Sequence, residues 1–419
     1  MASETAEPPP ITISEGYTLH TENAYYILLP PDNQAFLKPV EEFNHDLSMA
    51  CIRTWSELLN EEKQAKWQQS QERQAKKKEN GCGPKPKQVK KRGVKCPMHH
   101  PCRSVILEAL SATGLHSIHY AKEICHRESR ITNDYSPATI NGLADNTETI
   151  EAGSSETPKR QGSKPVPPKV RHHPSALMYD YRTERACVDV VDLDPYGAAA
   201  PFIDAVVQCM NDGGLVCVTC MNLSVLATLN YLEKWCALLC ASSSSGALRL
   251  VLHTILTSIA RYGRYIQPLL SLSIDFYVHL FVRIYTSANE VTKAFSGNIN
   301  YHFKAHAGLT VTGPMWSGSI HDPAFISKVL EHIEASNDKY GTSARMKGML
   351  TVAKEELNTP FYFMPAKIAG TFHCICPALD EVALALLHAG HQISRSHISA
   401  GSLKTTATRA DVHDVFCYS

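Results

Sequence analysis

The chain has 419 residues, which predicts two or three domains, and 44% of them are hydrophobic, as in a soluble protein that buries a core. Its 41 basic and 41 acidic residues cancel, so overall charge favours neither a nucleic acid nor a membrane as partner. No apolar run is long enough to cross a membrane, no secretory signal is evident, and many of the 14 cysteines lie inside apolar runs. These features argue against a membrane protein and a disulfide-rich secreted protein, and they predict an intracellular location.

The first hundred residues divide into three segments. Residues 1–10 end in three prolines and are predicted to be a disordered tail, while residues 11–60 contain a helical pattern around 43–58. Residues 61–98 are a basic insertion, since 61–95 hold 12 Lys or Arg and 4 Glu. Three interpretations stay open for this insertion: a solvated surface segment that is partly helical, a contact for RNA phosphates, or a nuclear import signal.

Residues 99–290 alternate between predicted strands and helices, with a loop rich in Ser, Pro, Lys and Gly at 151–168. The predicted strands are 104–110, 130–133, 188–193, 214–219 and 276–285, and the predicted helices are 115–124, 202–210 and 247–259. This alternation predicts an α/β fold with a parallel sheet and helices on both faces. Ligands of such sheets bind at the carboxyl ends of the strands, so site residues are expected in the loops that follow them.

Two of these loops have features of a nucleoside cofactor site. The loop after the first strand consists of small residues up to Gly114, which let a ligand approach the backbone at a helix N-terminus. Asp134 follows the second strand, where an acid can accept hydrogen bonds from both ribose hydroxyls. Taken singly, the loop also fits an ordinary strand–helix turn, and Asp134 also fits a helix N-cap.

The segment after the strand at 188–193 points to chemistry on an amine. It reads Asp192-Leu193-Asp194-Pro195-Tyr196-Gly197. An exocyclic base amine is a poor nucleophile because its lone pair is delocalised, and a carboxylate or carbonyl that accepts its N–H takes up developing positive charge. Pro195 fixes the turn, and Tyr196 can stack on a base. The segment resembles the D/N-P-P-Y/F box of nucleic-acid amino-methyltransferases; the alternative is a proline turn with a packed tyrosine.

Long strings across the chain resemble the tRNA N2-guanosine dimethyltransferases that modify guanine 26. The strings are PVEEFNHDLSMACI (39–52), LEALSATGLHSIHYAKEI (107–124), TNDYSPATI (132–140), VVDLDPYGAAAPFIDAVVQCMNDGGLVCVTC (190–220), ARYGRYIQPLLSLSIDFYVHLFVRIY (260–285), GPMWSGSIHDPAF (313–325) and HAGHQISRSHISAGSLKT (388–405). The resemblance implies a Rossmann-type class I S-adenosylmethionine-dependent methyltransferase domain at 99–290 and a smaller α+β C-terminal tRNA-binding domain at 291–419. It also implies successive methyl transfers to guanine N2, giving N2-methyl- and N2,N2-dimethylguanosine, with S-adenosyl-L-methionine as cofactor and tRNA as partner.

The resemblance assigns roles residue by residue. The predicted catalytic residues, which match the base-amine box, are Asp194, Pro195 and Tyr196. The predicted cofactor-binding residues are His45, Glu108, Ala109, Thr113, Gly114, His116 and Asp134. Residues 11–60 thereby contribute to the cofactor site through His45.

The chain departs from the family pattern on the cofactor side. His45 and His116 stand where the family has arginines that hold the cofactor carboxylate, and no acid precedes Ala176 to read the adenine amine. A histidine is shorter and mostly neutral at pH 7, which predicts weaker cofactor binding. One alternative function is therefore a degenerate homologue that binds tRNA with little or no activity. Another is an amino-methyltransferase of the same fold that acts on another nucleic acid or on a protein.

No metal site is predicted. The cysteine cluster for zinc that many family members carry is absent, since no cysteine lies between residues 286 and 312. A second group fits no standard zinc spacing, and it consists of Cys82, Cys96, His99, His100 and Cys102.

Three basic residues are predicted to face RNA: Arg261, Arg264 and Lys404. For Arg261 and Arg264 an ordinary helix end is the alternative. No protein partner can be inferred. The nucleus is the expected compartment, with the mitochondrion and the cytoplasm as alternatives.

Overall fold

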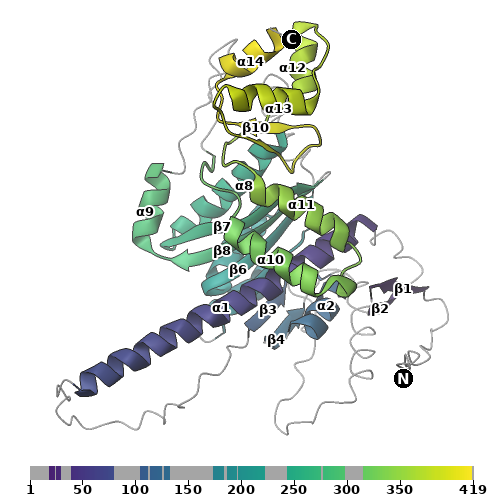
Figure 1. The fold of residues 1–419 in the computed structure, drawn as a ribbon. Helices are drawn as coiled ribbons and strands as arrows, with labels where there is room; N and C mark the ends of the chain where they lie inside the picture. The colour runs from purple at the N-terminus through teal and green to yellow at the C-terminus, as the bar shows by residue number, and fades with distance from the viewer. Residues whose placement is uncertain are drawn as a thin grey trace, which may run out of the picture.

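The computed structural model describes residues 18–23, 25–29, 39–79, 104–111, 114–124, 127–132, 173–183, 186–195, 197–221, 243–274, 277–297 and 315–417. Figure 1 shows a central sheet with helices packed against it, a long helix that extends away from the body, and a small unit near the C-terminus. The predicted α/β architecture, with a smaller C-terminal unit, is therefore confirmed.

The central sheet has the strand order β4-β3-β5-β6-β8-β7. Its strands are β3 (Ser104–Glu108), β4 (Arg127–Thr132), β5 (Val188–Leu193), β6 (Met210–Met221), β7 (Arg264–Ile274) and β8 (Tyr277–Thr286). β3 to β6 run parallel, whereas β8 is antiparallel to both of its neighbours. The prediction of a parallel sheet is wrong at β8, because β7 and β8 are joined by two residues and so short a connection links antiparallel strands.

Within the central sheet, β7 is the strand that the sequence pattern does not predict. All residues from Pro268 to Ile274 are buried, so the alternation of apolar and polar residues that marks a half-exposed strand is missing. The strand lies at the edge of the sheet, but the chain that follows covers it: Asp322 N donates to Leu269 O at 2.9 Å. Covering an edge strand in this way prevents it from pairing with other chains.

Two sets of helices cover the two faces of the sheet. The first set is α1 (Pro39–Glu79), α2 (Leu115–Glu123), α10 (Pro323–Ala335) and α11 (Ser343–Glu355). The second set is α4 (Pro174–Asp180), α5 (Ala200–Cys209), α8 (Ser243–Ala260) and α9 (Ala288–Gly297). Successive strand residues point to opposite faces, so Val190 packs with the first set and Val191 with the second. None of the described helices has the length and apolarity needed to cross a bilayer.

α1 is longer than its predicted pattern at 43–58. It has 41 residues and continues into the basic insertion. Phe43, Leu47 and Trp55 bury its first half against the sheet, while residues 64–66 and 68–74 are exposed. A two-stranded hairpin precedes it, formed by β1 (Thr18–Glu22) and β2 (Tyr25–Leu29).

A small unit with its own core follows α11. Its elements are α12 (Pro365–Phe372), α13 (Leu379–His388), β9 (Ile393–Arg395), β10 (Leu403–Thr405) and α14 (Arg409–Cys417). α10, the short 3-10 helix Asn337–Lys339 and α11 come before it, and α10 and α11 pack against the sheet. The separate core therefore begins after α11, rather than at the expected boundary of residue 291.

Candidate functional site

The ends of β3 and β5 lie side by side at one edge of the sheet. Glu108, the last residue of β3, pairs with Asp192 of β5, and Ala109 N donates to Asp192 O at 3.1 Å. Parallel neighbours end at the same edge, so the loop after β3 and the Asp194 segment after β5 are brought together. The two segments singled out in the sequence are thus neighbours in space.

Gly114 forms the turn between β3 and α2. Its φ of 76° lies in the left-handed region that glycine adopts without strain, and its N–H donates to Ser111 O at 2.7 Å. In the first turn of α2, the Ser117 hydroxyl donates to the buried Glu108 carboxylate. The turn directs the N-terminus of α2 toward the ends of β3 and β5, where the helix dipole favours polar or anionic groups.

Asp194 follows β5 and presents one carboxyl oxygen without a partner. Asn44 Nδ2, from α1, lies 3.4 Å from Asp194 Oδ2 and 3.4 Å from Thr219 Oγ1. Asp194 Oδ1 is shielded from solvent and accepts no hydrogen bond from any described residue. Burial raises the pKa of Asp194 to about 7, against the opposing positive charge of His116. A buried acceptor in this condition favours a ligand that brings an N–H donor.

The turn after Asp194 is closed by the backbone. Gly197 N donates to Pro195 O at 2.6 Å, and Gly197 has a φ of 155°. Pro195 is buried, and its carbonyl keeps a second lone pair for another donor. Three predicted site residues, Thr113, Asp134 and Tyr196, lie outside the described residues.

A small cavity of about 40 Å³ lies beside this turn. Its lining is almost entirely apolar and consists of Ala198, Ala199, Ala200, Ile203, Cys220, Val251, Thr254 and Ile255. Such a lining accepts the face of a ring or a methyl group, but it offers few of the polar partners that the edge of a base needs. The polar contacts in this region therefore come from Asp194 and the Pro195 carbonyl.

His116 and Asp192 form a buried ion pair next to Asp194. His116 Nδ1 lies 3.0 Å from Asp192 Oδ2, which also accepts a hydrogen bond from the Tyr120 hydroxyl. Burial opposes a charged imidazole, but the hydrogen bond and the charge of Asp192 outweigh it and raise the pKa of His116 to about 9. Asp192 therefore favours the charged form of His116, which opposes the weaker cofactor binding expected from a neutral histidine at this position.

His45 lies against His116 but remains neutral. The two rings are 4.1 Å apart in a T-shaped arrangement, and His45 Nδ1 lies 2.8 Å from Glu22 Oε1 of the hairpin. Burial, together with the charge of His116, holds the pKa of His45 well below its usual range. Burial also raises the pKa of Glu22 to about 7. Of the two histidines predicted to bind the cofactor, His116 is therefore the one whose charged form is favoured.

Three residues at this edge carry no signal in the sequence pattern: Glu22, Asn44 and Thr219. Glu22 reaches His45 from a separate hairpin, and Thr219 reaches Asn44 from the end of β6. These are tertiary contacts between elements far apart in the chain. Asn44 adjoins His45 in sequence, which is the only feature that could have indicated it.

Arg261 and Arg264 lie near the amino ends of the parallel strands, whereas Asp194 follows the carboxyl end of β5. Arg264 begins β7, and its Nη1 donates to two backbone carbonyls at the end of α5, at 2.7 and 2.9 Å. Arg261 is exposed and pairs with Asp204 at 3.2 Å. A contact between these arginines and RNA would therefore be remote from the amine box.

The position of Lys404 contradicts the prediction that this residue faces RNA. Its side chain is buried, and Nζ lies 2.9 Å from Glu356 Oε1 and 3.3 Å from Leu357 O. A buried ammonium that already pairs with a carboxylate is not available to a phosphate.

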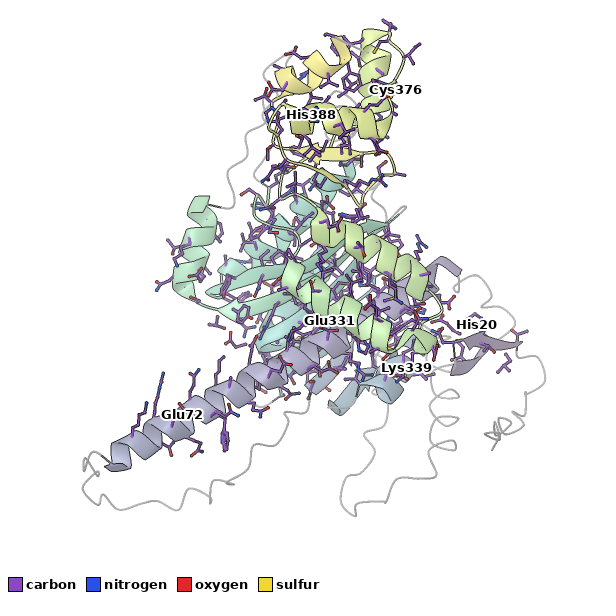
Figure 2. All side chains as sticks on the ribbon, in the orientation of Figure 1. His20, Glu72, Glu331, Lys339, Cys376 and His388 are labelled. Atoms are coloured by element: carbon purple, nitrogen blue, oxygen red, sulfur yellow. The ribbon has the colours of Figure 1, made fainter. Side chains whose placement is uncertain are left out.

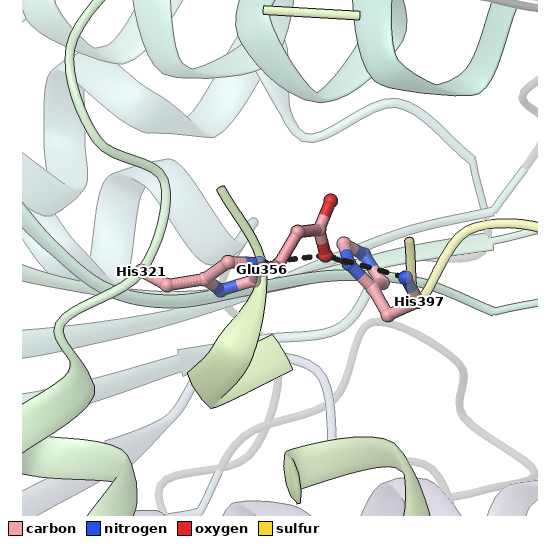
Figure 3. Close-up of side chains that lie close together, drawn as sticks. All are labelled: His321, Glu356 and His397. Carbon is pink, nitrogen blue, oxygen red and sulfur yellow. Dashed lines mark hydrogen bonds and ion pairs between the residues drawn. The ribbon is translucent and has the colours of Figure 1, made fainter. Parts of the chain in front are cut away.

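The same carboxylate is surrounded by two histidines (Figure 3). The ligand atoms of His321, Glu356 and His397 lie within 4.8 Å of one another, close enough for a metal ion. However, Ser271 N and Ser273 N of β7 donate to His321 Nδ1 and His397 Nε2, at 3.5 and 3.3 Å. The other ring nitrogens therefore carry hydrogen and point it at Glu356.

This geometry indicates an ion-pair network rather than a metal centre. Lys404 supplies the positive charge that Glu356 needs, and Ser396 Oγ donates to Glu356 Oε1 at 3.0 Å. Burial alone would raise the pKa of Glu356, but the donors around it hold the pKa far below its usual range. The network joins β7, the edge strand of the sheet, to the C-terminal unit.

A mixed sheet with a glycine turn after β3 and an Asp-Pro turn after β5 defines a class, the Rossmann-type methyltransferases. Within this class, the profile of the N2,N2-dimethylguanosine tRNA methyltransferases matches residues 16–305 and 298–417. The chain belongs to this family.

Individual relatives support the assignment. The mitochondrial tRNA (guanine(26)-N(2))-dimethyltransferase of Saccharomyces cerevisiae is 32% identical over 97% of this chain and 80% of its own length. The corresponding human protein is 31% identical over 95% of this chain and 67% of its own length. Trm1 of Pyrococcus horikoshii, solved with S-adenosyl-L-methionine, has the same fold: the TM-score is 0.71 at 19% identity, over 95% of this chain and 99% of that one.

Proposed function

We propose that this chain transfers methyl groups from S-adenosyl-L-methionine to the exocyclic N2 of guanine 26 in tRNA, giving N2-methyl- and N2,N2-dimethylguanosine. One observation carries the proposal: Asp194 holds a buried, unpartnered carboxyl oxygen at the carboxyl end of β5. Such an oxygen is an acceptor for an amine N–H.

The residues around His116 fit the methyl donor. His116 Nε2 is buried and has no hydrogen-bond partner among the described residues, and the protonated ring can hold the carboxylate of the amino-acid part of the cofactor. Glu108, Ala109 and Gly114 line the adjoining turn. His45 packs against His116 and fixes the position of its ring. When bound, the cofactor supplies an electrophilic methyl carbon on a sulfonium.

Asp194 and Pro195 prepare the amine for attack. Asp194 Oδ1 accepts one amine N–H, and the free lone pair of the Pro195 carbonyl is suited to the other. These bonds raise electron density on nitrogen and stabilise its positive charge as the N–C bond forms and the S–C bond breaks. The amine then loses a proton to Asp194, whose pKa of about 7 suits a base at neutral pH. A base in a stem reaches the site only when it is flipped out of the stack.

The alternative of a degenerate homologue without activity rests on the loss of the two arginines, and His116 weakens it. A histidine held as a cation by Asp192 provides the charge that the replaced arginine would provide. We therefore retain the active enzyme as the proposed function. Its action on tRNA places it inside the cell, and we propose the nucleus as its compartment, which a fluorescent fusion would test.

Nucleoside analysis of modified tRNA tests the function. Unmodified tRNA with guanine at position 26 is incubated with protein and S-adenosyl-L-methionine, digested, and analysed by mass spectrometry. Wild type is expected to yield both methylguanosines, whereas Asp194→Ala should lose at least about a hundredfold in kcat. A transcript with adenine at position 26 is the control. Absence of both nucleosides with wild type, while cofactor binding is measurable, would overturn the proposal.

A further inference from the structure

The second half of α1 extends from the body of the protein as an exposed arm, which we define as residues 63–79. Figure 1 shows it projecting beyond the sheet, and Figure 2 places Glu72 on this projecting part. Residues 64–66, 68–74 and 76 are exposed. At 1.5 Å per residue the arm is roughly 25 Å long. The exposed side chains of this helix are available to a partner.

Three cations of the arm share one face. Lys63, Lys66 and Arg73 recur with Ser70 at spacings of three and four residues, which places them along one stripe of the helix. Glu72 lies on the opposite face. Over residues 63–79 the sequence has six cations and two acids, Glu72 and Glu79. The stripe is therefore a line of positive charge rather than a mixture of both signs.

The acids at the base of the arm are already paired with the body. Glu62 accepts two hydrogen bonds from Arg283, both at 2.6 Å, and Glu61 pairs with Lys328 at 2.9 Å. These contacts anchor the base of the helix and remove the two nearest acids as partners for the cations beyond it. The charge of the stripe is thus left for an external anion.

The arm begins near the amino ends of the parallel strands, whereas the candidate site lies at their carboxyl ends. α1 crosses the sheet: Asn44 contacts Asp194 at the carboxyl edge, and Glu62 contacts Arg283, whose Nε donates to Gly213 O near the start of β6. The 18 residues between Asn44 and Glu62 span roughly 27 Å. A ligand that touches both Asp194 and the stripe must therefore be a large, extended polyanion.

We infer that the stripe on the arm binds the sugar-phosphate backbone of the tRNA substrate, at a part of the tRNA remote from the methylated guanine. The inference rests on the proposed function for the identity of the RNA. Charge complementarity carries it, since a row of cations matches a row of phosphates. An acidic membrane surface fits less well, because membrane-binding helices need an apolar face and the side opposite the stripe holds Gln64, Gln68 and Gln71.

Removal of the stripe tests the inference. The variant Lys63→Gln, Lys66→Gln, Arg73→Gln keeps good helix formers but loses three charges. With full-length tRNA at about 0.15 M salt, Kd is expected to rise roughly tenfold or more, and the slope of log Kd against log salt concentration to fall by about two. The kcat at saturating tRNA should stay unchanged, because the arm does not touch Asp194.

A matched control carries three changes on the other face: Gln64→Ala, Gln68→Ala and Gln71→Ala. It should bind tRNA like wild type, and circular dichroism should give equal helix content for all three proteins. A short stem-loop that carries the target guanine but cannot extend to the arm should bind wild type and stripe variant equally.

Three results would overturn the inference. They are an unchanged Kd and salt slope in the stripe variant, an equal loss of affinity for the short stem-loop, and a loss of binding to acidic vesicles or of nuclear import without any loss of tRNA affinity. Failure of the proposed function is distinguishable, since it appears as wild-type protein that makes no methylguanosine. The inference about the stripe is tested by the affinity for tRNA, and this affinity does not depend on turnover.

Discussion

His116 of α2 and Asp192 of β5 form a buried pair in which Nδ1 lies 3.0 Å from Oδ2. The pair stands at the carboxyl edge of the sheet, one strand residue before the turn that holds Asp194. It explains how a histidine can carry positive charge there. The carboxylate keeps the imidazole protonated, and the burial of both groups strengthens their interaction.

Substitution of His116 should weaken binding of the methyl donor. His116→Gln removes the cation but keeps a hydrogen-bond donor, and loss of a charge-assisted bond predicts a Kd for S-adenosyl-L-methionine that rises by roughly tenfold or more. His116→Arg keeps a fixed cation at this position and should bind within a few-fold of wild type. Calorimetric titration measures both values. A His116→Gln protein that binds as tightly as wild type would contradict the assignment of His116 to the cofactor.

The stability of the free protein should fall as pH rises above neutrality. The pKa of His116 is raised from 6.5 to about 9 in the folded state, so the stability it contributes is complete below pH 6.5 and is lost as pH rises through 9. The loss amounts to at most about 3 kcal/mol. Urea unfolding at pH 6.5 and pH 9 measures it. His116→Gln should show a smaller change over this interval, and an equal change in both proteins would show that another group titrates.

The sequence pattern predicts the elements that are short, apolar and well delimited. The strand at 188–193 has the same bounds in the structure, because its hydrophobic run is broken on both sides. β7 is missed because it is buried almost throughout, and the full length of α1 is missed because half of the helix packs on the sheet while the other half is polar. Periodicity reports the burial of one face, whereas a strand buried on both faces, such as β5 or β7, can be recognised only from a short run rich in apolar residues.

The site is predictable where residues are adjacent in sequence and less so where the fold assembles them. Asp194 and Pro195 form one turn, so the box can be read from the sequence. The proton on His116 depends on Asp192, which lies 76 residues away in the chain. Lys404 is predicted wrongly for the same reason, since its charge says nothing about the buried Glu356 that pairs with it.

Disruption of the network around Glu356 should destabilise the protein strongly. Glu356→Gln preserves shape but leaves Lys404 buried without a counter-charge, which costs roughly 3 kcal/mol or more in the free energy of unfolding. The double variant Glu356→Gln, Lys404→Met removes both charges and should recover part of this loss. Urea unfolding measures each protein.

The addition of zinc distinguishes an ion-pair network from a metal centre at His321, Glu356 and His397. Because His321 and His397 direct N–H groups at Glu356, zinc should leave the melting temperature of wild type unchanged. A rise in melting temperature that depends on Glu356 would contradict the network interpretation.

The pH dependence of methylation should be bell-shaped. Asp194 must be ionised to accept the amine proton, and its pKa of about 7 predicts that kcat/KM rises as pH passes through neutrality. His116 must be protonated to hold the cofactor, and its pKa of about 9 predicts a decline above that pH. Initial rates of methyl transfer to tRNA between pH 6 and 10 measure the profile, with His116→Arg as the matched variant. Arginine stays charged over this range, so its profile should keep the rise near 7 and lose the decline near 9. A decline that persists in His116→Arg would assign it to a different group.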